Sequence, residues 1–490
     1  MAFSGCSTFT SYTYIPDYQL EQALIDLGHD TAPIDGKIAT SEIAKITHLD
    51  ISKKEILNMT GLQDFVSLTE LDCSANALRI LDVSKNKALE KLDCSGNRLS
   101  ILDVSKNKAL KKLDCSGNRL SVLDVSKNVL LTNLDCRNNQ LASLEVSKNE
   151  ALVYLYCADN KLTAVNVAKN INLTTFNCYC NRLTSLDVTK NVTLTYLNCR
   201  RNELASLDLT KNTSLTELDC SENHLDVLNT SKNGVLIRLD CYVNSLTSLD
   251  LAKNTKLEFL YCYDNSLAVL DFGNITALTD IGCYNNQLTT LDVSKNSSLG
   301  QLYCGNNKLK SLDVSQNIKL GILYCEGNQL TVLEIGRNSG FTMLSCGNNK
   351  LKSLDLSTQD SLTNLWCSDN QLTVLNVDKS TSLGVLECSA NQLAELDVSR
   401  NAGLTYLRCF KNQLVSLDVS KNTVLTWLGC KKNKLRSLKI NNGNNYNLST
   451  LDARWNPGLR CIQVDSIIGP EGEYYWKKDA ATKYSISPCR

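Results

Sequence analysis

Cysteine is the residue of this chain with the most reactive side chain, and its spacing is regular. The 490 residues include 22 cysteines, eighteen of which recur every 21 residues from Cys73 to Cys430. Thiols at a fixed spacing could form disulfides, bind metal ions or pack as small apolar groups. In a stack of similar turns, neighbouring side chains point the same way rather than at one another, which disfavours disulfides. We therefore interpret the eighteen as a buried cysteine ladder.

Other residues that could do chemistry do not form a recognisable constellation. The three histidines, His29, His48 and His224, have no partner at the spacing of a zinc site or of a nucleophile and its base. Rows of aspartate such as Asp103 and Asp124 could form a calcium ladder, but adjacent lysine rows disfavour it. Lys+Arg and Asp+Glu both number 51, which argues against a nucleic-acid partner. The sequence predicts no enzyme, no cofactor and no metal.

The 21-residue repeat predicts the elements that must hold these side chains. One unit reads Leu89-x-x-Leu92-x-Cys94-x-x-Asn97-x-Leu99, followed by x-x-Leu102-Asp103-Val104-Ser105-Lys106-Asn107. The first half is a leucine-rich-repeat pattern, and the alternation of Leu92 and Cys94 predicts a short strand with both side chains inward. The amide of Asn97 is placed to satisfy backbone groups of its own and the neighbouring turn. The second half has too few residues for a helix and predicts an extended or 3₁₀ segment.

The predicted fold is an α/β-type solenoid, a curved leucine-rich-repeat horseshoe with parallel strands on its concave face and a helical N-terminal cap. Residues 1–14 are expected to be a flexible leader and 15–45 a helical cap with Asp17 as N-cap. The solenoid is expected over residues 46–459, with eighteen regular repeats from 68 to about 445 and degenerate ones at each end. Residues 460–490 form a C-terminal cap, in which Cys461 and Cys489 are expected to pair if the compartment is oxidising.

Aromatic residues gather at three positions of each unit: before the strand leucine, between that leucine and the cysteine, and after the cysteine. All eleven tyrosines of residues 68–440 occupy these positions, which point into the concave groove. Strand packing would also favour aromatics, but it does not explain the choice of face. The predicted ligand-binding residues are Tyr154, Tyr156, Tyr179, Tyr196, Tyr242, Phe259, Tyr261, Tyr263, Tyr284, Tyr303, Tyr324, Trp366, Tyr406, Phe410, Trp427, Arg200 and Arg408.

Charge on this face is uneven along the chain. Acidic residues occupy the first repeats, including Asp72, Asp93 and Asp114, whereas later strand ends are basic, including Lys431 and Lys432. A groove with opposite charges at its two ends suits a protein partner with complementary patches. Ordinary solvated charge is an equally weighted interpretation.

The repeat resembles bacterial surface leucine-rich-repeat proteins of the internalin type, specifically a Bacteroidetes-like subclass with 21-residue repeats and a cysteine ladder. The resemblance covers residues 68 to about 445 and implies adhesion or surface recognition without catalysis, outside the cell or on its surface. Phe3-Ser4-Gly5-Cys6 is similar to the end of a lipobox, although the rest of a signal peptide is missing upstream. Lipidation of Cys6, with outer-membrane anchoring, and an accidental cysteine are equally weighted interpretations.

The function predicted from the sequence is recognition or adhesion by a monomer that binds a protein ligand through the aromatic groove. A glycan-binding surface lipoprotein that assists polysaccharide capture is the first alternative, because tyrosine and tryptophan rings can stack on sugars. A structural spacer is the second alternative. No nucleic acid is expected, and a membrane would be contacted only through a lipid anchor, because no run of 18 apolar residues exists.

Overall fold

The computed structural model describes residues 10–338, 340–466 and 475–489. Its contacts divide the chain into two compact units: unit 1 comprises Met1–Leu236 with Val243–Ser245, and unit 2 comprises Ile237–Tyr242 with Leu246–Arg490. Both units are built from successive turns of about 21 residues, and almost every turn contributes one three-residue strand to a parallel row. The predicted leucine-rich-repeat solenoid is confirmed at the level of these turns.

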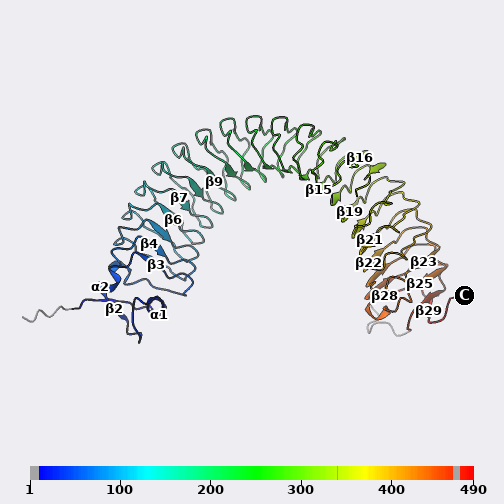
Figure 1. Cartoon of the computed structure of the whole chain (residues 1–490), viewed down its shortest axis with the longest axis horizontal. Coiled ribbons are helices and arrows are strands. Elements are labelled where there is room, and N and C mark those ends of the chain that lie inside the picture. The colour runs from blue at the N-terminus through cyan, green and yellow to red at the C-terminus, as the bar shows by residue number, and fades with distance from the viewer. Residues whose placement is uncertain (1–9, 339, 467–474, 490) are drawn as a thin grey trace, which may run out of the picture. The chain divides into compact units, whose positions relative to one another are not determined.

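In unit 1 the strands of successive turns pair in parallel and in register, so that Leu71 lies beside Leu92 and Leu92 beside Leu113. They occupy the same side of each turn (Figure 1). The strands are β3 (His48–Asp50), β4 (Glu70–Asp72), β5 (Lys91–Asp93), β6 (Lys112–Asp114), β7 (Asn133–Asp135), β8 (Tyr154–Tyr156), β9 (Thr175–Asn177), β10 (Tyr196–Asn198) and β11 (Glu217–Asp219).

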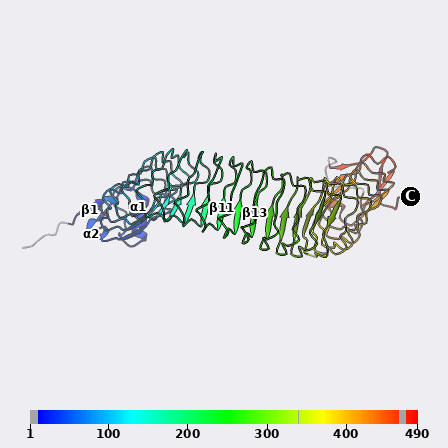
Figure 2. The same cartoon turned by 90° about the horizontal axis from the view of Figure 1, so that it is seen from above.

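Unit 2 continues the same pattern, and its strand arrows run side by side in Figure 2. Its inner strands are β12 (Arg238–Asp240), β13 (Phe259–Tyr261), β14 (Asp280–Gly282), β15 (Gln301–Tyr303), β17 (Ile322–Tyr324), β19 (Met343–Ser345), β20 (Asn364–Trp366), β21 (Val385–Glu387), β22 (Tyr406–Arg408), β24 (Trp427–Gly429), β26 (Thr450–Asp452) and β28 (Trp476–Lys477). Six outer segments also pair as strands: β16 (Ser311–Asp313), β18 (Val332–Glu334), β23 (Ser416–Asp418), β25 (Ser437–Lys439), β27 (Cys461–Gln463) and β29 (Lys483–Ser485).

The outer segments are less regular than predicted. Most of them form neither a strand nor a 3₁₀ helix, although their leucines and valines are buried. The 3₁₀ helices of the described residues are η1 (Leu62–Asp64) and η2 (Asn445–Asn447), both near the ends of the repeat array. Burial of the apolar side chains therefore holds these segments in place without backbone pairing in most turns.

The cysteine ladder lies in the core, as the alternation predicted. Leu92 and Cys94 are 2% and 0% exposed, and all eighteen ladder cysteines are buried free thiols. Ladder amides continue the backbone pairing beyond the strand, as where Cys94 N–H donates to the carbonyl oxygen of Asp114 in the next turn (2.9 Å). The small thiol fills the inward space and leaves the backbones of adjacent turns close enough to pair.

The asparagine three residues after each ladder cysteine links neighbouring turns. Asn97 Nδ2 donates to the carbonyl oxygens of Cys73 in the preceding turn (3.0 Å) and Cys94 in its own turn (3.1 Å). Its Oδ1 accepts from the backbone N–H of Leu78 in the preceding turn (3.0 Å). The structural role predicted for this asparagine is confirmed, because its amide serves backbone groups that the strand cannot reach.

A second row of buried asparagines was not predicted. Asn107, the last residue of the Ser-Lys-Asn motif, is 0% exposed, and its Nδ2 donates to the carbonyl oxygens of Val83 (2.9 Å) and Asn86 (2.8 Å) of the preceding turn. The same bonds recur at Asn128. The recurrence of this asparagine every 21 residues is visible in the sequence, but the recurrence alone does not indicate that its side chain is buried.

The N-terminal segment folds against the first turn. Helix α1 (Tyr18–Asp26) has Asp17 as N-cap, and the same carboxylate accepts from the backbone N–H groups of Leu57 (2.8 Å) and Asn58 (2.9 Å). A second helical turn, α2 (Thr40–Ile43), and an antiparallel pair, β1 (Tyr12–Tyr14) with β2 (Lys37–Ala39), complete the segment. The pairing of β1 with β2 was not predicted from the sequence.

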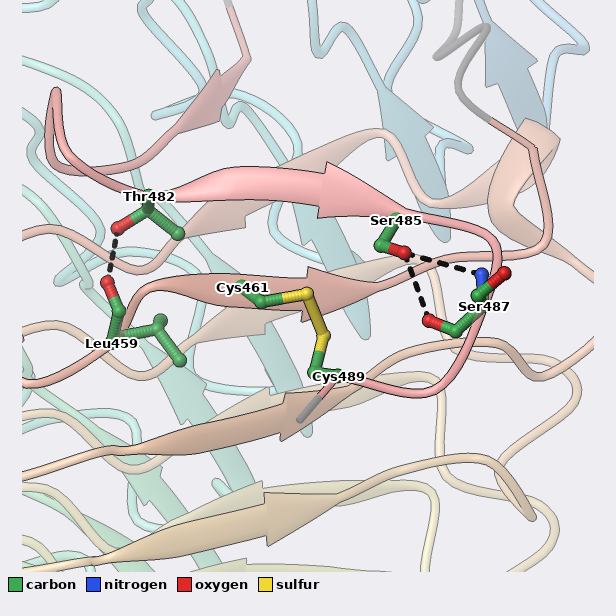
Figure 3. Close-up of a disulfide and its surroundings, with 6 residues drawn as sticks. All are labelled: Leu459, Cys461, Thr482, Ser485, Ser487 and Cys489. Carbon is green, nitrogen blue, oxygen red and sulfur yellow. Dashed lines mark hydrogen bonds between the residues drawn. A yellow bond between two sulfur atoms is a disulfide. The ribbon is translucent and has the colours of Figure 1, made fainter.

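The C-terminal segment carries the single disulfide of the described residues. Cys461 on β27 is bonded to Cys489, which follows β29 (Figure 3). Thr482 Oγ1 donates to the carbonyl oxygen of Leu459 (2.7 Å), and β29 pairs in parallel with β27. The segment that follows β29 is thus joined to β27 by a covalent bond.

The ladder thiols are expected to be unreactive in the folded protein. Burial raises the pKa of the Cys157 thiol to about 12, and thiolate is the reactive form. Cys180 is only half-buried, although burial and Asp159 also raise its pKa. Under native conditions a thiol reagent should modify Cys180 slowly and the eighteen ladder cysteines not at all. Mass spectrometry identifies the modified residues. Labelling of a ladder cysteine as fast as Cys180 would show that the turns open.

Candidate functional site

The solvent-facing side of the inner strands carries the variable residues. We call this surface the strand face and number its positions in each turn: first, before the strand leucine; second, between leucine and cysteine; third, after the cysteine. The predicted residues at the first position are Tyr154, Tyr196, Phe259, Tyr406 and Trp427. Those at the second are Tyr156, Tyr261, Tyr303, Tyr324, Trp366 and Arg408, and those at the third are Tyr179, Arg200, Tyr242, Tyr263, Tyr284 and Phe410.

Three tyrosines at the third position stack face to face in unit 2. The ring centroids of Tyr242 and Tyr263, and of Tyr263 and Tyr284, are 4.3 Å apart, with interplanar angles of 11° and 10°. Burial and the two neighbouring phenols raise the pKa of Tyr263 well above its ordinary value. The middle ring therefore has both faces covered, and its hydroxyl is neutral at physiological pH.

Gly282 makes room for the rings beside this stack. A Cβ at Gly282 would lie 2.8 Å from Cδ1 of Tyr261 and 3.5 Å from Cδ1 of Tyr263. Any other residue at this position would have to displace the Tyr261 ring. The glycine thus allows Tyr261 and Tyr263 of the preceding turn to lie close to the sheet.

An uncharged strip follows the stack toward the C-terminus. It consists of the first and second positions of β15, β17, β19 and β20 and the first position of β21: Gln301, Tyr303, Ile322, Tyr324, Met343, Ser345, Asn364, Trp366 and Val385. The rings of Tyr303 and Tyr324 meet edge to face at 5.3 Å, and those of Tyr324 and Trp366 at 6.1 Å. Ser345, which has a small side chain, is the register partner of both Tyr324 and Trp366. All nine side chains of the strip are half-buried.

Met343 and Ile322 of this strip were not among the residues predicted from the sequence, which were chosen for aromatic rings and for arginine. Met343 Sδ lies 3.7 Å from the hydroxyl of Tyr324. The available signal was the absence of charge at the first and second strand-face positions of four successive turns and at the first position of the fifth, beside a single charged third position, Glu326. Interface cores are depleted of charge and enriched in tyrosine, tryptophan and methionine, so this signal is more specific than the aromatic count.

Arginines lie over several of the predicted aromatic rings. Arg137 lies 5.1 Å from the Tyr156 ring centroid, and Arg238 lies 5.2 Å from that of Tyr261. Arg200 lies over Tyr179 at 5.7 Å, and its Nε donates to Glu222 at 2.8 Å. Arg200 is therefore already paired with a carboxylate, which weakens the prediction that it binds a ligand.

The acidic residues predicted on the first repeats line a cavity of about 530 Å³ in unit 1. Asp72, Asp93, Asp114 and Asp135 occupy the second positions of β4–β7 in register, and Lys91 and Lys112 occupy first positions beside them. Each aspartate accepts the backbone N–H two residues later, as Asp114 does from Ser116 at 2.9 Å. The carboxylates stay close together because each is fixed by its own turn.

Asp114→Asn is expected to raise the melting temperature by about 2 °C at pH 7. Burial first, and then Asp135 and Asp93, raise the folded-state pKa of Asp114. A raised pKa means that the neutral form stabilises the fold; this contribution is complete below the unfolded pKa near 3.8 and is lost as pH rises through the folded pKa. Asparagine is neutral at every pH and can still accept from Ser116, as Asn177 does from Tyr179 in a later turn.

Asp103→Asn is the matched control. Asp103 accepts from Ser105 N–H at 2.8 Å on the outer side, and hydrogen bonds from Ser105 lower its pKa. Its charged form therefore stabilises the fold above the unfolded pKa, and asparagine should bring no gain at pH 7. Melting curves of both variants at pH 3 and pH 7 check this, and an equal gain from both would contradict the cause assigned to Asp114.

Neither a metal centre nor a membrane span is found in the described part of the chain. Within residues 10–338, 340–466 and 475–489, no three histidine, cysteine or acidic side chains are placed to hold a metal ion. No helix of these ranges is long and apolar enough to cross a membrane. Cys6, the predicted lipidation site, lies outside the described residues.

Comparison with solved structures finds leucine-rich-repeat proteins. The functional domain of InlJ from Listeria monocytogenes, which includes a cysteine ladder, is 30% identical over 87% of this chain and 77% of its own, with a TM-score of 0.50. YopM from Yersinia enterocolitica is 20% identical over 94% and 99%, with a TM-score of 0.64. The plant peptide hormone receptor RGFR1, in complex with RGF2, is 19% identical over 87% and 77%, with a TM-score of 0.68. No protein-family model and no curated protein matches the sequence.

Proposed function

Because the chain belongs to the internalin-type leucine-rich-repeat proteins with a cysteine ladder, we propose that it is a non-enzymatic recognition protein of the cell surface that binds a protein ligand. The proposed contact surface is the uncharged strip of unit 2, together with the neighbouring tyrosine stack. The remaining aromatic positions of the strand face are proposed to extend this surface within each unit.

The observation that carries the proposal is the composition of the uncharged strip. Nine positions, the first and second of β15, β17, β19 and β20 and the first of β21, contain two tyrosines, one tryptophan and one methionine and no charged side chain, and the third positions beside them include one charged residue, Glu326. Burial within the protein is incomplete for all nine, so part of each side chain remains open to a partner. Aromatic anchors in an uncharged centre, surrounded by polar residues, are typical of protein–protein hot spots.

The charged residues beside the strip support the same partner class. Asp280 lies at the first position of β14, before the strip, and Glu387 and Arg408 follow it at the second positions of β21 and β22. Such a charged rim fixes the register of a bound protein and contributes more to the association rate than to the affinity. A uniformly apolar groove would provide no comparable selectivity.

Ring packing favours a protein over a sugar as the ligand of the tyrosine stack. Stacking on a sugar needs an open ring face, whereas both faces of Tyr263 are covered by its neighbours. The stack offers ring edges and hydroxyl groups, which suit hydrogen bonds to a polypeptide. The extracellular location and the absence of catalysis are parts of the proposal that rest on family membership.

The test is capture of a ligand by the wild-type chain and by Tyr324→Ala/Trp366→Ala, offered both cell-surface protein extracts and a glycan library. Loss of two central aromatic anchors should weaken binding of a captured protein at least about 30-fold. Tyr446→Ala is the matched control, because Tyr446 is 84% exposed on η2, away from the strand face. All three proteins should keep similar melting curves.

Each other result contradicts a specific part of the proposal. Equal capture by the wild type and the double variant would show that the strip is only strand packing. Capture of glycans that depends on Trp366, without a protein ligand, would favour the glycan-binding alternative. No capture from either source would favour the structural spacer.

A further inference from the structure

The last turns of unit 2 have a strong excess of positive charge. Residues 401–490 contain 14 lysines and arginines against six acidic residues, a net charge of +8, although the whole chain has a net charge of 0. An excess of this size in one end of a neutral protein creates a local positive potential. The potential favours anionic partners at this end.

Part of this charge lies on the strand face and is held by aromatic rings. Arg408 lies 4.7 Å from the ring centroid of Phe410, and Lys431 lies 5.3 Å from the same centroid. Lys432 and Arg454 lie 4.6 Å and 5.2 Å from the centroid of a Trp455 ring. Contacts of this kind fix the cations without neutralising them.

The two exposed lysines of this end follow the third strand-face position of their turns. Lys411, Lys432 and, in the next turn, Trp455 have φ values of 53°, 54° and 56°. Other turns have the same left-handed backbone with glycine, as at Gly96, or with a different side chain, as at Val243. The position therefore accepts many residue types, and the last turns use it for two lysines and a tryptophan.

Carboxylates of the same turns do not neutralise the cluster. Asp452 pairs with Arg454 at 2.8 Å and with Lys431 at 3.6 Å, and Glu387 pairs with Arg408 at 3.6 Å. Lys411 and Lys432 are exposed, and neither forms an ion pair with a carboxylate of the described ranges. These two ammonium groups therefore project from adjacent turns with their donors open to solvent.

We propose that Lys411 and Lys432, on the cationic end formed by β22, β24 and β26, bind an acidic segment, rich in aspartate and glutamate, of the protein ligand. The nature of this partner rests on the proposed function, because the cationic end continues the strand face directly beyond the uncharged strip. A sugar or a nucleobase would need an open aromatic face, and cations already lie against Trp455 and Phe410. Carboxylates need only the ammonium and guanidinium donors that remain.

The test measures binding of a fluorescent twelve-residue peptide of alternating aspartate and glutamate by anisotropy at low ionic strength. Lys411→Gln/Lys432→Gln should weaken binding about tenfold, and added salt should weaken wild-type binding steeply. Lys421→Gln/Lys434→Gln is the matched control: it removes the same charge from the same turns, and Lys434 instead contacts Gln413 at 3.1 Å. The control should bind like the wild type, and a peptide of asparagine and glutamine should not bind.

Three results would overturn the inference: no binding of the acidic peptide, equal weakening by both double variants, or binding of heparin but not of the peptide through Lys411 and Lys432. The two proposals fail separately. If a captured protein ligand needs Trp366 but binds Lys411→Gln/Lys432→Gln as well as the wild type, the proposed function stands and the proposed acidic segment is contradicted. If the peptide needs both lysines but the captured ligand binds Tyr324→Ala/Trp366→Ala as well as the wild type, only the role of the uncharged strip is contradicted.

Discussion

Replacing Asn118 by alanine is expected to lower the free energy of unfolding by about 3–5 kcal/mol. Asn118 Nδ2 donates to the carbonyl oxygens of Cys94 (3.0 Å) and Cys115 (3.1 Å), and its Oδ1 accepts from Leu99 N–H (2.9 Å). All three backbone groups are buried, so the variant leaves them without this partner inside the protein. Equilibrium unfolding in urea gives the loss, and hydrogen exchange at Leu99 shows where it occurs.

Asn172→Ala is the control for this prediction. Asn172 is exposed, and its Nδ2 donates to the carbonyl oxygen of Glu150 at 3.2 Å. Water can replace this bond, so the loss should stay below about 0.5 kcal/mol. Equal losses in the two variants would show that the asparagine row does not hold neighbouring turns together. Unchanged exchange at Leu99 in Asn118→Ala would contradict the local mechanism.

Removing the Cys461–Cys489 disulfide is expected to destabilise the C-terminal segment by about 3–4 kcal/mol. The bond closes a loop with a sequence separation of 28, and a crosslink of this span restricts the unfolded chain. Because each turn contacts only its neighbours, the effect should stay near β27 and β29. Cys461→Ser/Cys489→Ser should therefore become sensitive to limited proteolysis in this segment while the earlier turns remain protected.

A reductant separates the disulfide from any role of the other thiols. It should lower the stability of the C-terminal segment in the wild type and leave Cys461→Ser/Cys489→Ser unchanged, because the ladder cysteines are already free thiols. A further loss in the double-serine variant would show that another disulfide contributes. Equal protease resistance of all samples would show that packing alone holds the segment.

The turns could be predicted from the sequence because their contacts are local and periodic. Leu92 lies beside Leu113, Cys94 N–H donates to Asp114, and Asn97 Nδ2 donates to the carbonyl oxygen of Cys73. A 21-residue recurrence in the chain is therefore also a recurrence in space. The N-cap at Asp17 was predicted for a similar reason, since capping depends on residues two and three positions away. The sequence was sufficient to predict a contact wherever the two residues in contact are separated by a fixed number of positions in the chain.

The parts that could not be predicted depend on side chains without a period. The pairing of β1 with β2 joins residues outside the repeat, and no recurrent offset indicates it. On the strand face, the repeat gives the position of each aromatic residue in its turn, but the packing of the rings depends on local neighbours. Gly282 leaves the space in which the Tyr261 and Tyr263 rings lie. Counting aromatic residues at each position of the repeat does not reveal this contact.

The turn-to-turn bonding has a consequence for how such a chain can change over generations. Asn97 and Asn107 each bond to the preceding turn at a fixed sequence offset. Duplication or loss of 21 codons therefore preserves every one of these bonds, whereas an insertion of a few codons breaks them at one place. Recombination between coding repeats can thus lengthen or shorten the molecule by whole turns, and with each turn it adds or deletes three strand-face positions.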